Sequence, residues 1–195
     1  MFIPAFICLA LMSATSRPAA EQPQRVDRTI RIELVVDRAP SEVYSLWTTE
    51  DGLKKWFAPD ARVDARAGGR YEIIFDPQTD PDGSLRGTKG ARILDLVPRK
   101  KLVFEWIAFV GQQQPGNGGP PYMPEPERSS QKTRVEVTFT ASPNDASKTR
   151  ITLVHSGFRD GAKWDEALAY FRDKAWPGVL QRLANYCHQG TLPSY

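Results

Sequence analysis

The 195-residue sequence has few residues of the kinds that build disulfides, metal centres or basic surfaces. It contains two cysteines and two histidines, and the histidines, His155 and His188, share no ligand spacing. We therefore expect neither a metal site nor another cofactor. Lysine and arginine number 26 against 23 aspartate and glutamate, and no basic run is interleaved with aromatic residues. A nucleic-acid partner is not expected from this charge pattern.

The first twenty residues differ from the rest of the chain because they are mostly apolar. An apolar stretch covers residues 2–12, small residues follow it, and Arg17 carries the only side-chain charge. The stretch is too short to span a bilayer, so we interpret residues 1–20 as a secretory signal peptide and predict a secreted or periplasmic protein. Its removal would leave Cys187 without a disulfide partner and leave no membrane-spanning segment. The alternative is an apolar start that packs on the core or frays.

Alternation of apolar and polar residues dominates the chain from residue 29 onward. Two short helices are predicted after the first strand, one opened by Pro40 and one by a capping-box pattern that starts at Thr48. Residues 111–128 hold four glycines and five prolines, which predicts a solvated loop. The alternating stretches predict strands near residues 29–37, 61–64, 70–75, 88–97, 102–109, 133–140 and 148–156.

After Gly157 the hydrophobic period changes from two residues to about 3.6, which predicts one long C-terminal helix. Asp160 is placed to cap its N-terminus. Pro177 lies inside the helical pattern, lacks an amide donor and clashes with a carbonyl one turn earlier, so we expect a kink or a restart there. The predicted apolar stripe of this helix comprises Trp164, Leu168, Phe171, Ala175, Val179, Leu183 and Tyr186.

The order of these elements predicts a single α+β domain over residues 29–190. A curved antiparallel sheet of about six to seven strands, wrapped around the long C-terminal helix, would bury all the apolar stripes. This arrangement is the helix-grip fold. Residues 21–28 are expected to form a flexible N-terminal segment, and residues 191–195 a tail.

Six short motifs occur along the chain: VYxLW from Val43, GLxxWFxP from Gly52, GGxY from Gly68, LVFEW from Leu102, TLxHSGF from Thr152 and YFxxxAWxxVL from Tyr170. In this order they resemble the START-like (SRPBCC) superfamily, and within it bacterial proteins related to the C-terminal domain of the activator of the heat-shock protein ninety ATPase. The resemblance implies an apolar cavity between the sheet and the long helix. Members range from lipid carriers to polyketide cyclases, so the resemblance assigns no reaction.

The predicted inward faces are rich in large rings, as the linings of ligand pockets often are. Each ring taken alone is equally explained by core packing. His155 must find a partner, because an unpaired buried imidazole costs about 1–3 kcal/mol. It is a core histidine bonded to a backbone carbonyl or to a Trp or Tyr neighbour, a polar anchor for a ligand, or a general base. The candidate cavity residues are Tyr71, Phe75, Phe104, Trp106, His155, Trp164 and Phe171.

Three functions remain open from the sequence. The first is an exported, non-enzymatic protein that binds a small hydrophobic molecule or a lipid. The second is a chaperone-interaction protein, as the resemblance implies, although export would separate the chain from the cytosolic chaperone. The third is a cyclase- or hydrolase-like enzyme that uses the same cavity. No nucleophile with a base, no paired inward carboxylates and no phosphate-binding signature can be identified, so we assign no catalytic residue.

Overall fold

The computed structural model describes residues 28–108 and 129–190. Along the chain, the elements are β1 (Ile30–Val36), α1 (Pro40–Thr48), α2 (Glu50–Lys54), β2 (Asp60–Val63), β3 (Tyr71–Ile74), β4 (Ile93–Val97), β5 (Lys101–Ile107), η1 (Ser129–Gln131), β6 (Lys132–Ser142), β7 (Asp145–Ser156), α3 (Ala162–Tyr170), η2 (Phe171–Ala175) and α4 (Trp176–Gln189). Four predicted segments lie wholly or mostly outside the described residues, namely the signal peptide at 1–20, the N-terminal segment at 21–28, the Gly/Pro-rich stretch at 111–128 and the tail at 191–195.

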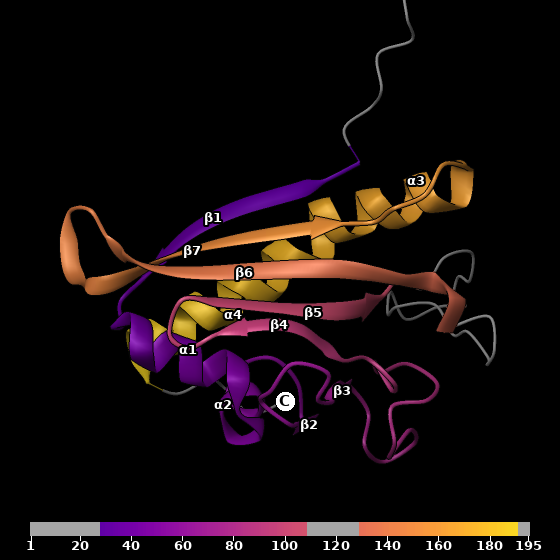
Figure 1. Ribbon diagram of the computed structural model, residues 1–195, viewed down its shortest axis with the longest axis horizontal. Helices are drawn as coiled ribbons and strands as arrows, with labels where there is room; N and C mark the ends of the chain where they lie inside the picture. The colour runs from indigo at the N-terminus through magenta and orange to yellow at the C-terminus, as the bar shows by residue number, and fades with distance from the viewer. Residues whose placement is uncertain (1–27, 109–128, 191–195) are drawn as a thin grey trace, which may run out of the picture.

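The main sheet is antiparallel and has five strands in the order β1-β7-β6-β5-β4. Strands β2 and β3 pair separately, and Arg70 beside β3 forms an isolated bridge with Arg92 beside β4. Figure 1 shows the curved main sheet in front of the long helical segment from α3 to α4. The α+β helix-grip prediction is confirmed, with the seven strands of the described residues divided between two sheets.

The predicted strand at residues 88–97 is shorter than the alternation indicated, because it begins at Ile93. Residues 89 and 90 instead form a turn in which Gly90 has a φ of 81°, and Arg92 makes only the isolated bridge with Arg70. The Thr88 hydroxyl accepts a hydrogen bond from the Ile73 N–H at 2.7 Å and ties this turn to β3. The Thr88 backbone N–H also donates to the Ile73 carbonyl at 2.9 Å, so the backbone and the side chain together hold residue 88 against β3.

Helices α1 and α2 pack closely where the chain turns between them. Pro40 occupies the first turn of α1, as predicted. The N-cap of α2 is Thr49, one residue later than the predicted capping box, and its hydroxyl accepts a hydrogen bond from the Gly52 N–H at 3.0 Å. Thr48 is instead the last residue of α1, and its hydroxyl donates back to the Tyr44 carbonyl.

The C-terminal helix is interrupted, as the position of Pro177 predicted. Helix α3 gives way to a π-helical turn, η2, and α4 then starts with Pro177 in its first turn. A proline in a first turn gives up no intrahelical hydrogen bond, which explains why the restart occurs there. The predicted cap at Asp160 is wrong, because Gly161 holds the N-cap position with a φ of 120° and no side-chain cap bond.

The π-helical turn also changes which residues of the C-terminal helix face the core. A π turn holds one residue more than an α turn, so the residue that follows Phe171 on the buried face is Trp176 and not Ala175. The predicted stripe is therefore correct up to Phe171 and largely displaced beyond it. The buried residues of this helical segment are Ala167, Leu168, Phe171, Trp176, Leu180, Leu183 and Cys187.

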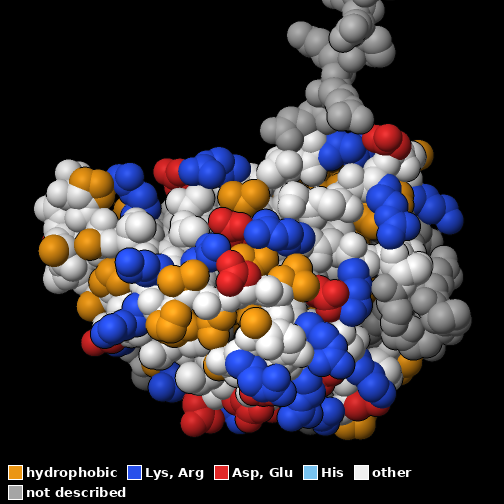
Figure 2. Space-filling model, viewed as in Figure 1, with side chains coloured by type: hydrophobic (Ala, Val, Ile, Leu, Met, Phe, Trp, Pro, Cys, Tyr) orange, Lys and Arg blue, Asp and Glu red, His pale blue; other side chains and the backbone are white. Residues whose placement is uncertain are grey.

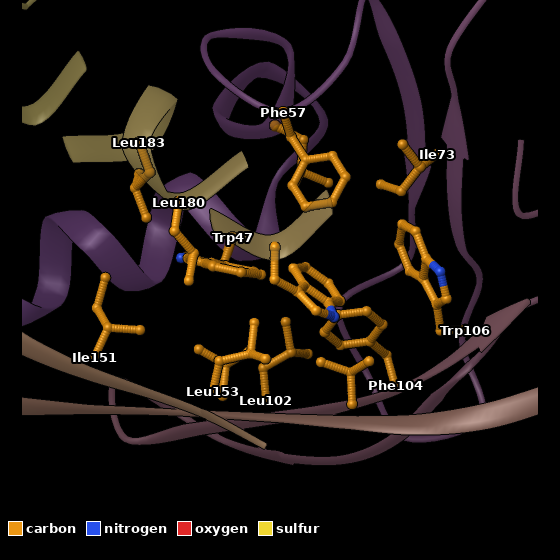
Figure 3. Close-up of a cluster of buried hydrophobic side chains, with 14 of the residues drawn as sticks. Trp47, Phe57, Ile73, Leu102, Phe104, Trp106, Ile151, Leu153, Leu180 and Leu183 are labelled. Carbon is orange, nitrogen blue, oxygen red and sulfur yellow. The ribbon is translucent and has the colours of Figure 1, made fainter. Parts of the chain in front are cut away.

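The core lies between the sheet and the C-terminal helix. Figure 3 shows Leu102, Ile151 and Leu153 on the sheet side, with Leu180 and Leu183 of α4 facing them. Trp47 of α1 fills the space between these two groups of aliphatic side chains. All six side chains are buried, and buried residues alternate with partly exposed ones along β7 from Lys148 onward.

The opposite face of the sheet faces the solvent and carries charged side chains together with exposed hydrophobic ones such as Val35. Figure 2 shows Lys and Arg side chains interspersed there with Asp and Glu. Two ion pairs on this face join Arg134 to Glu136 and Lys132 to Glu105, each at 2.7 Å. Within residues 28–108 and 129–190, no helix is long and apolar enough to cross a membrane.

Candidate functional site

An aromatic cluster connects the sheet to the C-terminal helix at one end of the core. Trp106, near the end of β5, lies at its centre and is 4% exposed. We refer to Trp106 and its ring neighbours as the Trp106 cluster. The ring centroids of the neighbours lie 5.4–6.3 Å from that of Trp106, and the neighbours are Phe57, Phe75, Phe104, Phe171 and Trp176.

Two further predicted cavity residues join the edge of this cluster. The Tyr71 ring packs on Phe104 with centroids 4.3 Å apart, and its hydroxyl donates to the Trp47 carbonyl at 2.9 Å. Burial raises the pKa of Tyr71, so the phenol stays protonated and acts as a donor. The His155 ring lies 5.1 Å from that of Phe171. Six of the seven predicted residues thus form one continuous set of rings.

Trp164, the seventh predicted residue, lies farther out on α3. Its indole is partly buried and contacts the Phe158 ring at a centroid distance of 6.4 Å. The Arg159 guanidinium carbon lies 5.2 Å from the Trp164 ring centroid, which is a cation–π distance. The ring centroids of Phe158 and Phe171 lie 6.1 Å apart. Among the ring contacts of the described residues, Trp164 is therefore connected to the Trp106 cluster only through Phe158.

Sequence reasoning missed three rings of this region, each for an identifiable reason. Trp176 was assigned to the wrong helix face because the π-helical turn could not be seen in the sequence. Phe57 follows α2 in a loop, where alternation carries no information about burial. Phe158 follows a glycine after β7 and belongs to no periodic segment. All three lie in quoted family motifs, and that was the one signal that could have found them.

His155 is fully buried, and both of its ring nitrogens have partners. The Trp176 N–H donates to Nδ1 at 2.9 Å, while Nε2 lies 2.8 Å from the Thr133 hydroxyl. The same hydroxyl donates to the Trp106 carbonyl at 3.1 Å. The imidazole therefore has the first of the three arrangements considered above, a core histidine bonded to a tryptophan neighbour.

These contacts fix the tautomer of His155. An indole N–H can only donate, so Nδ1 must accept and must be unprotonated. The proton is then on Nε2, which donates to the Thr133 oxygen, and the Thr133 hydroxyl proton points to the Trp106 carbonyl. Because each group has one partner of the correct kind, the chain leaves no imidazole lone pair for a substrate proton.

Burial lowers the pKa of His155 from 6.5 to about 3, since the charged imidazolium cannot be solvated in this core. The imidazole is consequently neutral at physiological pH. This neutrality agrees with the hydrogen bond from Trp176, which a protonated Nδ1 could not accept.

The lowered pKa predicts how stability depends on pH. The unfolded chain binds a proton at His155 below about pH 6.5, whereas the folded protein does not. The contribution of the neutral imidazole is therefore complete above about pH 6.5 and is lost as the pH falls. We expect the free energy of unfolding to fall by about 1.4 kcal/mol per pH unit between about pH 6 and pH 4. Urea titrations across this range should show that slope, and a His155→Ala variant should lack it.

The other potentially reactive side chains among the described residues do not form a catalytic or metal-binding arrangement. Cys187 is buried, and burial raises the pKa of its thiol to about 11, so the thiolate is scarce at neutral pH. Within the part of the chain that the structure describes, no group of three or more His, Cys, Asp or Glu side chains is arranged to hold a metal ion.

A surface cleft of about 280 Å³ lies apart from the Trp106 cluster, between α1, α2 and α4. It contains none of the seven predicted cavity residues. Its charges are balanced, because Arg38 and Lys55 face it together with Glu42 and Asp51. The remaining lining residues are Ser45, Leu46, Thr49, Gly52 and Tyr186.

The sequence pattern of one family, the Activator of Hsp90 ATPase homolog 1-like proteins, matches residues 37–188, from the end of β1 to the end of α4. The chain belongs to this family. The predicted relationship is thereby confirmed, together with its placement among START-like proteins. Among curated proteins, none matches the chain.

Solved structures share the fold of this chain. Protein MLL2253 from Mesorhizobium loti is 20% identical, with a TM-score of 0.58, over 84% of this chain and 99% of that one. The Aha1 dimer from Colwellia psychrerythraea is 23% identical, with a TM-score of 0.55, over 83% of this chain and 97% of that one. At these identities the likeness establishes a common fold and leaves the function to be argued from the site.

Proposed function

We propose that this Activator of Hsp90 ATPase homolog 1-like protein binds a small apolar molecule at the Trp106 cluster, between the sheet and the C-terminal helix. The observation that carries this proposal is the π-helical turn Phe171–Ala175. Its geometry is less favourable than that of an α-helix, and such turns occur frequently at functional sites. Here the turn brings Phe171 and Trp176 together against Trp106, with centroids 6.3 and 5.4 Å away.

The chemistry of the cluster favours binding over catalysis. Its rings offer a large apolar surface, which suits a flat or aliphatic guest. His155, at its edge, is neutral and has both nitrogens bonded, so it has no free base to offer a substrate. We therefore propose a carrier or sensor of an apolar molecule and assign no reaction to it.

Binding can be tested with the apolar fluorescent probe N-phenyl-1-naphthylamine. We expect a saturable rise in probe emission, with one site per chain and matching quenching of tryptophan emission. Phe75 is half-buried beside Trp106, so Phe75→Ala removes a cluster ring with little effect on the rest of the core. It should weaken binding about tenfold, the equivalent of losing partial burial of one ring.

Tyr44→Ala is the matched control for this titration. Tyr44 is also a half-buried aromatic residue, but it packs on Phe139, and its ring is not part of the Trp106 cluster. Its removal should leave the probe affinity within about twofold of the wild type. Unsaturable emission in the wild type, or equal weakening by the two variants, would contradict binding at the cluster.

The family's description favours a second candidate, activation of the Hsp90 ATPase. We propose that export separates the protein from that partner, with residues 1–20 acting as a signal peptide. Sequencing the N-terminus of protein from a periplasmic or culture fraction should then start near Glu21. Recovery of Met1 in the cytosolic fraction, with stimulation of purified Hsp90 ATPase, would reverse the order of the two candidates.

A further inference from the structure

We infer that the bound molecule is neutral and presents a hydrogen-bond acceptor, such as a ketone, ester or ether oxygen, to the indole N–H of Trp106. This inference rests on the proposed function and specifies the chemical class of its ligand. The observation behind it concerns the indole nitrogen of Trp106. Trp106 is only 4% exposed, and its buried Nε1 has no hydrogen-bond partner among the described residues.

Buried donors are normally bonded, because an unmade hydrogen bond costs the desolvation of the group. Two other buried indoles illustrate this rule. The Trp56 N–H donates to the Leu46 carbonyl at 3.0 Å, and the Trp176 N–H donates to His155 at 2.9 Å. Trp106 therefore departs from the pattern of its own cluster. A donor left open at the centre of a set of rings suits an atom that the protein itself does not supply.

Trp47 is the second buried indole without a partner among the described residues, and its surroundings differ from those of Trp106. Figure 3 shows the Trp47 nitrogen pointing toward Leu180, inside the packed aliphatic core. It shows the Trp106 nitrogen on the ring edge that is turned away from Phe104. Phe75, a half-buried ring, also contacts Trp106, so this end of the core is nearer to solvent. The Trp106 N–H is consequently the better placed of the two to meet a ligand.

The electrostatic surroundings of Trp106 select a neutral acceptor. An indole N–H donates and cannot accept, so the ligand must bring a lone pair. A carboxylate would need a cation to offset its burial. Lys132 on the adjacent strand lies on the opposite face of the sheet, where its Nζ binds Glu105 at 2.7 Å. His155 is held neutral by its two hydrogen bonds. A carbonyl or ether oxygen on an apolar body satisfies all of these conditions.

The test compares two probes of nearly the same shape, 2-nonanone and n-nonane, by displacement of N-phenyl-1-naphthylamine. The wild type should bind the ketone about tenfold more tightly than the alkane, as expected for one buried hydrogen bond. Trp106→Phe keeps an aromatic ring and removes the N–H, so its two affinities should agree within about twofold. Trp47→Phe, the matched control, should retain the tenfold preference.

A spectroscopic measurement identifies the donor directly. In a ¹H–¹⁵N correlation spectrum, the indole signal absent from Trp106→Phe belongs to Trp106. 2-Nonanone should move that proton signal downfield, and n-nonane should not. Equal affinities for both probes in the wild type would overturn this inference and leave the proposed function standing. Binding of neither probe would overturn both.

Discussion

Replacing His155 with alanine is expected to lower the free energy of unfolding by about 3–5 kcal/mol. The substitution empties the space of a fully buried ring and leaves the Trp176 N–H without an acceptor. The Thr133 hydroxyl keeps its bond to the Trp106 carbonyl, so the main polar loss falls on Trp176. Urea unfolding at pH 7 measures the effect. An unfolding free energy within about 0.5 kcal/mol of the wild type would contradict this role.

His188 provides the control, because it is the other histidine of the chain. Its side chain is 73% exposed and contacts Asp37 at 3.0 Å on the surface. His188→Ala should change the free energy of unfolding by no more than about 0.5 kcal/mol.

A double-mutant cycle separates the hydrogen bond from the volume of the His155 ring. Trp176→Phe removes the donor, so His155→Ala in that background should cost about 1–2 kcal/mol less than in the wild type. Simple addition of the two single effects would mean that ring packing alone holds His155 in place. This cycle also tests the tautomer assignment, since the coupling depends on Nδ1 accepting from Trp176.

Gly52→Ala is expected to destabilise the protein by about 3 kcal/mol, through the contact between α1 and α2. A Cβ at this position would lie 2.4 Å from the Ser45 carbonyl oxygen and 2.7 Å from the Leu46 Cα. Both atoms belong to the backbone, so a rotamer change cannot relieve the clash. The two helices would have to separate above the buried Trp47 and Leu53. Thermal unfolding should move down by about 6–12 °C for a chain of this size.

Gly178→Ala is the matched control, and its expected effect has the opposite sign. A Cβ on Gly178 would meet no atom within 4 Å, and the residue lies in the first turn of α4. The substitution should stabilise the protein by up to about 1 kcal/mol, because alanine loses less backbone entropy in a helix. If both variants unfold at the same temperature, the close contact between α1 and α2 is not the reason for a glycine at position 52.

Most of the fold could be predicted from local patterns. Alternation located the strands because inward and outward side chains alternate along a half-buried strand, whatever the rest of the chain does. The break in the C-terminal helix was equally local, since Pro177 lacks its amide donor in any context. Residues 88–92 departed from prediction because the chain turns at Lys89 and Gly90, just after Thr88 bonds to Ile73 through both its backbone and its side chain.

The candidate site was predicted less completely. The ring content of β5 could be predicted, and Trp106 with it. Helical periodicity placed Ala175 where the structure has Trp176, because a π-helical turn adds one residue. Such a turn is stabilised by packing on both sides and has no signature in the residues that form it. A Trp neighbour was among the partners expected for His155, but Trp176 could not be named because the predicted stripe held Ala175 in its place.

The sequence by itself determined the helix-grip fold, the family and the need for His155 to find a partner. These properties depend on residue type and short-range spacing. Only the tertiary structure decided the phase of α4, the tautomer of His155 and which indole N–H remains open. Each of these depends on atoms that come together from strands and helices far apart in the chain. Hydrogen-bond satisfaction in a core is a property of the assembled neighbours, and no single segment carries it.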